Sequence, residues 1–160
     1  MPTIPETRNS VAYLWLGNLD TTKRDHRAAI ANYRKAVDID PNSASALNNL
    51  ASTLSEYSNA RDESLKFARQ AREQAPDQPE YADTLGWILY RKGVYNSAVK
   101  VLEGAVAEKE AEAGWKCHLA MAYLKGGSLR RARAKLDAEL KQNPNAAEAQ
   151  AARKLFGITN

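Results

Sequence analysis

The chain is organised around residues 81–105, which read YADTLGWILYRKGVYNSAVKVLEGA. The Leu-Gly pair at 85–86 has equivalents at 16–17, 50–51 and 119–120, so successive pairs stand 34, 35 and 34 residues apart. The small residue Ala98 likewise recurs as Ala29, Ser64 and Ala132. Since both features keep one period, the sequence predicts four copies of a single structural unit.

Large and small residues alternate in this pattern. The large apolar residue Leu102 recurs as Tyr33 and Leu136, whereas the second unit has Ala68 there. A further small residue, Ala105, has as its equivalents Ala36, Ala71 and, breaking the series, Glu139. Three of the four units are closed by a proline, at 41, 76 and 144.

Small, large and small residues at these fixed offsets resemble the tetratricopeptide repeat family over roughly residues 10–144. The resemblance implies an all-α fold, a right-handed superhelical solenoid of four helix-turn-helix units. The first (A) helices would line a concave inner face and the second (B) helices the outer face. It implies a binding scaffold rather than a catalytic fold. We expect small residues such as Gly86 to let the two helices of a unit approach closely, and a larger side chain to overpack them.

The domain plan follows from the repeat. The four units are expected at 10–43, 44–78, 79–112 and 113–144. Residues 1–9 read as a flexible segment. Residues 145–160 are expected to form a capping helix and tail, because the ends of solenoids need a cover.

The predicted helices begin and end at turn signals. They span residues 10–22, 25–39, 44–57, 62–74, 79–92, 95–108 and 113–125, with one more helix after a cap at Ser128 and the capping helix at 146–156. The first turn lacks the glycine present at Gly93 and Gly127. Arg24 must therefore make that turn with a β-carbon, where glycine would be easier if φ is positive.

Length and composition restrict the class of protein. A chain of 160 residues with 44% hydrophobic residues suits one globular domain. It has no apolar run near 18 residues and no secretory signal, so we expect a cytoplasmic protein, or a periplasmic one if the chain is a fragment of an exported protein. The single cysteine excludes an internal disulfide. A net charge of +4 is compatible with acidic partners and is not diagnostic of nucleic acid.

Catalytic and metal-binding signatures are missing from the sequence. His26 and His118 lie in different units without a third ligand at metal spacing. Cys117 and His118 are adjacent on a helix, so their side chains diverge by about 100°. There is no phosphate loop, nucleophile elbow or carboxylate pair. We therefore predict no enzyme and no cofactor.

The densest basic cluster is RRARAK at 130–135. It could contact nucleic acid or an acidic surface. We favour a solvated outer face, because Ala132 and Leu136 point inward and the charges lie around the helix between them. No aromatic residues are interleaved with the charges, which argues against binding of single strands.

The resemblance places a ligand-binding groove on the A helices. Its expected residues are Leu14, Asn18, Asn48, Asn49, Ser52, Asp83, Trp87, Tyr90, Arg91, Cys117, Met121 and Lys125. They would form an apolar and aromatic floor with amide and charged groups for an extended peptide or a helix. The alternative is that Trp87, Tyr90 and Met121 are partly packed between neighbouring A helices.

Two details refine this groove. Trp87 is local to one unit, where the other units have Asn18, Ser52 and Met121, so it is a candidate binding anchor whose removal should leave the fold nearly intact. One subfamily grips the C-terminal carboxylate of heat-shock chaperones. Asn18, Asn49 and Arg91 match that clamp, but Leu14 and Trp87 occupy its lysine places. Without the charge-assisted bonds of these lysines, the clamp is not predicted.

The sequence therefore predicts a protein–protein interaction scaffold that binds a peptide or helix in its concave groove, within a larger protein or assembly. Its style, as in LGWILYRKG at 85–93, looks like that of bacterial repeat proteins. The alternative is a self-assembling scaffold, in which the groove of one copy takes the N-terminal segment or the final helix of another. A basic nucleic-acid-associated helical protein is a third, disfavoured reading.

Overall fold

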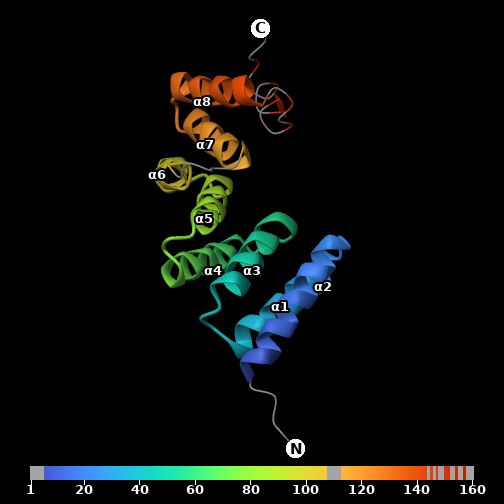
Figure 1. The fold of residues 1–160 in the computed structure, drawn as a ribbon. Coiled ribbons are helices and arrows are strands. Elements are labelled where there is room, and N and C mark those ends of the chain that lie inside the picture. Colours follow the sequence, from blue (N-terminus) through green and yellow to red (C-terminus); the bar gives the residue numbers. More distant parts are fainter. Residues whose placement is uncertain are drawn as a thin grey trace, which may run out of the picture. The chain divides into compact units, whose positions relative to one another are not determined.

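The computed structural model describes residues 6–107 and 113–143, together with residues 145, 147, 150, 151, 154 and 157. Over these residues the structure has eight α-helices and no strand, which confirms the all-α prediction (Figure 1). The helices are α1 (Glu6–Thr22), α2 (His26–Ile39), α3 (Ala44–Tyr57), α4 (Arg61–Gln74), α5 (Pro79–Arg91), α6 (Tyr95–Ala105), α7 (Ala113–Lys125) and α8 (Leu129–Gln142).

Two helix ends differ from the prediction by more than one residue. Residues 6–9 belong to α1 and not to a flexible segment. They are polar and carry no apolar period, but Glu6 suits the positive end of a helix dipole. Helix α6 ends at Ala105 rather than near 108, just after Gly104, a poor helix former. The predicted capping helix falls largely outside the described residues, of which 147, 150, 151 and 154 are helical.

The chain forms two compact units, residues 1–84 and 85–160, and the boundary lies within α5. In the first, α1 packs on α2, α2 on α3, and α3 on α4. In the second, α6 packs on α7 and α7 on α8. Within each unit the helices that pack together are thus neighbours in the sequence, which is the adjacency of a solenoid.

Close helix contacts occur where the repeat predicts them. A Cβ at Gly17 would lie 2.4 Å from Tyr33 Cε1, and a Cβ at Gly86 would lie 2.4 Å from Leu102 Cγ. Real Cβ atoms do not approach another atom so closely, so only glycine allows these two helix pairs to pack as they do. The predicted fit of a small residue against a large one is confirmed in both units.

In the second repeat, α3 packs on α4 with smaller side chains at the equivalent positions. Ala51 and Ala68 are both buried, so neither glycine nor a large residue is present. Ser64, at the small position of α4, is also buried, and its Oγ donates to the backbone oxygen of Ala51 at 2.8 Å. Its hydroxyl is therefore satisfied inside the core.

The turn between α1 and α2 has the strained residue that the sequence indicates. Arg24 has φ 62°, close to the values of 80° at Gly93 and 85° at Gly127. Asp25 follows as the N-cap of α2, and its Oδ1 accepts from Ala28 N at 3.0 Å. Ser128, in contrast, stands at the N-cap of α8 without the side-chain hydrogen bond expected of a cap. No helix in the described part of the chain is long and apolar enough to cross a membrane.

Candidate functional site

An asparagine pair joins the A helices of the first two repeats. Asn49 Nδ2 on α3 donates to Asn18 Oδ1 on α1 at 3.0 Å. Tyr33 Oη donates to the same oxygen at 2.9 Å. Asn18 Oδ1 thus accepts from two neighbours, Asn49 on α3 and Tyr33 on α2. Turning over both amides would give an equivalent network, and in either orientation the pair keeps an unbonded amide nitrogen and an unbonded amide oxygen. Asn18 Nδ2 and Asn49 Oδ1 make no hydrogen bond within the described residues, so the pair offers one free donor and one free acceptor.

Tyr33 anchors this pair through the hydrogen bond of its hydroxyl group to Asn18. The residue is buried, and its ring contacts the bare Cα position of Gly17. Burial raises the pKa of the Tyr33 hydroxyl above its ordinary value, more than its hydrogen bond with Thr21 lowers it. The hydroxyl therefore stays protonated and remains a donor to Asn18 over the whole neutral range.

A pocket of about 240 Å³ opens over the asparagine pair. Its lining residues are Asn18, Thr21, Tyr33, Asn49, Ser52 and Thr53. All are polar and none is charged. The pocket can therefore take a ligand group that hydrogen-bonds without carrying a charge.

The second compact unit has an aromatic stack. The ring of Trp87 on α5 lies 4.2 Å from that of His118 on α7, with an interplanar angle of 18°. The ring of Tyr90 also stacks on that of Trp87, with the ring centres 4.9 Å apart and an interplanar angle of 9°. All three side chains are half-buried. Trp87 thus packs between neighbouring A helices, as the alternative reading of the sequence holds, while keeping part of its surface open.

The asparagine pair and the aromatic stack occupy the same repeat positions. Asn49 follows Asn18 by 31 residues, and His118 follows Trp87 by the same interval. In both cases the ninth residue of one unit contacts the sixth residue of the next. The sequence analysis missed His118, and this interval is the signal that could have found it.

Other predicted groove residues are not accessible. Asn48, Asp83 and Cys117 are 3%, 7% and 1% exposed, which corrects the expectation that they face a ligand. All three are fifth residues of their units, and the fifth residue of the first unit, Leu14, packs against the hydrophobic core. The fifth position therefore belongs to the packing between helices.

The remaining predicted residues are dispersed. Met121 packs against the core cluster of Cys117, Ala120 and Leu136. Arg91 is half-buried, and Ser52 is exposed in the pocket over the asparagine pair. Lys125 lies at the end of α7, where it lines a separate pocket with the turn residues 93–96 and Gly126. The described residues contain no group of three or more His, Cys, Asp or Glu that could hold a metal ion.

Known proteins share this repeat. Residues 17–56 match the family described as TPR repeat. The chain is 30% identical over 103 residues to a TPR repeat-containing protein of Pseudomonas aeruginosa, covering 64% of this chain and 15% of that protein. It is 31% identical over 90 residues to the small glutamine-rich tetratricopeptide repeat-containing protein 2 of Mycosarcoma maydis, covering 56% of this chain and 25% of that protein. The chain thus spans a quarter or less of the length of these two relatives.

The fold has solved counterparts. YrrB, described as a TPR protein with an unusual peptide-binding site, has a TM-score of 0.72 and 20% identity, covering 92% of this chain and 78% of that one. At this identity the similarity concerns the fold. Together with the four repeats in phase and the glycine contacts at Gly17 and Gly86, these matches establish the relationship. Residues 17–56 are a tetratricopeptide repeat, and the described part of the chain has the fold of tetratricopeptide repeat proteins, which is a scaffold for protein–protein interaction.

Proposed function

We propose that the chain binds an extended, internal segment of a partner protein on its A-helix face, through the asparagine pair of Asn18 and Asn49. The observation that carries this proposal is the hydrogen-bonded pair itself, which Tyr33 anchors and which keeps a free donor and a free acceptor. A residue in an extended segment presents its own N–H and C=O on the same side, so it complements the pair. Main-chain hydrogen bonds of this kind supply affinity with little dependence on the ligand's sequence.

The neutral lining of the pocket favours an internal segment over a chain end. None of the six lining residues carries a charge. A terminal carboxylate would lose hydration there without gaining a charge-assisted hydrogen bond. This agrees with the lack of lysine at Leu14 and Trp87, the places that the carboxylate clamp requires.

The second compact unit offers, by itself, a different kind of contact surface, the aromatic stack. Trp87 and His118 occupy the positions of the asparagine pair and present flat, half-buried rings. Such rings suit an apolar or aromatic side chain of a ligand. YrrB, similar in fold, is described as having a peptide-binding site, which fits a peptide as the class of ligand.

A displayed library of random peptides, selected on the full chain, tests the proposal. Peptides selected on the original chain are synthesised and titrated against Asn49→Ala, with Asn59→Ala in the exposed α3–α4 turn as the matched control. Loss of one or two hydrogen bonds should weaken binding to Asn49→Ala about tenfold, while Asn59→Ala binds normally. The proposal fails if no peptide is enriched, or if the enriched peptides bind Asn49→Ala as tightly as the original chain.

A further inference from the structure

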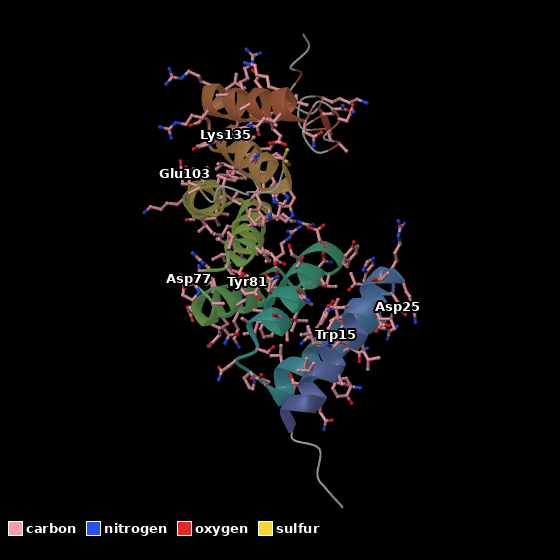
Figure 2. All side chains as sticks on the ribbon, in the orientation of Figure 1. Trp15, Asp25, Asp77, Tyr81, Glu103 and Lys135 are labelled. Carbon is pink, nitrogen blue, oxygen red and sulfur yellow. The ribbon has the colours of Figure 1, made fainter. Side chains whose placement is uncertain are left out.

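One side of α1 exposes an apolar stripe. Four of its large side chains, Val11, Trp15, Leu16 and Leu19, are 51%, 68%, 46% and 48% exposed. At 100° per residue they form one continuous band with Ala12, which we call the α1 stripe. Figure 2 marks Trp15 on this helix. Apolar side chains gathered in one band, rather than scattered singly, mark an interaction surface.

The same band is covered in the next repeat. Thirty-four residues after Ala12, Leu16 and Leu19 stand Ala46, Leu50 and Thr53 on α3, which are 0%, 0% and 6% exposed. Helix α2, the B helix of the preceding repeat, packs on α3. In the fourth repeat Leu119 and Ala122 take the places of Leu16 and Leu19, and both are buried on α7, against which α6 packs. The α1 stripe therefore continues an interface that the molecule builds twice with a B helix.

The chemistry of the matching helix can be taken from α2. In the core shared with α3, α2 supplies the small residue Ala36 and the branched residue Val37, with Ile30 partly buried beside them. The α1 stripe has larger side chains than α3, with Trp15 and Leu19 where α3 has Asn49 and Thr53. A helix with alanine and branched aliphatic residues complements such a surface. Two α1 stripes face to face would set large side chains against large ones, a poorer fit.

We propose that the α1 stripe docks an amphipathic helix of a partner protein, seated as α2 is seated on α3. The helix has small and branched apolar residues at the spacing of Ile30, Ala36 and Val37. This surface differs from the asparagine pair, whose two residues line the polar pocket. Docking on the stripe therefore stands independently of peptide binding in that pocket.

A lactam-stapled peptide with the sequence of residues 25–40, which is α2 with its flanking caps, serves as the probe. It carries a fluorophore and is titrated into the full chain by anisotropy. Binding should weaken at least tenfold for the double variant Trp15→Lys/Leu19→Lys. Both side chains are about half or more exposed, so this variant should keep the original melting temperature. A peptide with Val37→Asp is the matched control and should not bind.

Two results overturn the proposal. One is failure of the peptide to bind, or equal binding to the original chain and to Trp15→Lys/Leu19→Lys, since the peptide would then sit elsewhere. The other is a dimer of the full chain in sedimentation that the same double variant converts to a monomer, because a second copy and not a partner helix would then cover the stripe. Monomeric chains with stripe-dependent peptide binding support it.

Discussion

Lys116 Nζ on α7 lies 2.9 Å from Glu139 Oε2 on α8. The side chain of Glu139 is 4% exposed, although the equivalent residue of each other repeat is alanine. A buried carboxylate without a cation is strongly destabilising, so the lysine explains how the fourth repeat tolerates glutamate at this place.

Removing the lysine should therefore destabilise the fold. We expect Lys116→Met to lower the free energy of unfolding by about 3 kcal/mol, the low end for broken buried pairs, because Lys116 is partly exposed. The double variant Lys116→Met/Glu139→Ala, which restores alanine, should recover most of the loss. Urea denaturation of the three chains provides the measurement. Equal stability of Lys116→Met and the original chain would show that the ion pair is dispensable.

Gly86 should tolerate no methyl group. Gly86→Ala places a Cβ against Leu102, and we expect it to lower the free energy of unfolding by about 1–3 kcal/mol despite the better helix propensity of alanine. Adding Leu102→Ala should relieve the clash, because the second repeat has alanine at both of these places, Ala51 and Ala68. The control is Gly104→Ala in α6, where the new Cβ meets no atom within 4 Å. Thermal unfolding should give Gly86→Ala a lower melting temperature than Gly104→Ala. Equal melting temperatures would show that the helix contact at Gly86 has room for a methyl group.

Arg24→Gly should stabilise the first turn. A non-glycine residue in the left-handed region costs about 1–2 kcal/mol, and the extra freedom of glycine in the unfolded chain returns about 0.4–1 kcal/mol of this. We therefore expect a gain of up to about 1 kcal/mol. Lys23→Gly, one residue earlier and without a positive φ, should instead lose stability. Differential scanning calorimetry compares the two, and a lower melting temperature for Arg24→Gly contradicts the strain.

Trp87 should contribute to stability as well as to binding. Trp87→Ala removes stacks on Tyr90 and His118, each worth about 0.5–1.5 kcal/mol, so the free energy of unfolding should fall by about 1–3 kcal/mol. Trp15→Ala is the control, because that ring is 68% exposed and unstacked in the described part of the chain. Guanidinium denaturation should separate the two variants. Equal losses would mean that the stack adds nothing, and would return Trp87 to the role of a pure binding anchor.

The helices could be predicted from the sequence because each repeat spaces its apolar residues at a helical period. Helices α3 and α7 have the predicted ends. Serine is favoured just before a helix, as at Ser43, and glycine just after one, as at Gly126. The start of α1 could not be predicted in the same way, because polar residues such as Glu6 form helix without an apolar signal.

The candidate site was harder to predict, because exposure depends on the neighbouring helix. The position rule predicts that Asn18 faces a ligand, and this stays a prediction. The same rule treated Asn48 and Cys117 as accessible, although the packing of α3 and α7 buries them. The partnership of Lys116 with Glu139 joins charges from two helices, and no local pattern marks it. Periodicity shows which residues share a face, whereas the contacts across that face depend on the size of the side chains opposite.

The unequal small–large pairs of the repeats also bear on misfolding. Gly17 receives the ring of Tyr33, whereas the second repeat has Ala51 and Ala68, both buried, at the equivalent places, so a methyl group stands where Gly17 has none. If α2 paired with α3 as its B helix during synthesis, the ring of Tyr33 would meet that methyl group. Identical repeats invite such wrong pairings and exchange of helices between chains. The difference between Gly17 and Ala51 therefore disfavours this wrong pairing and helps to keep a repetitive chain in register as it folds.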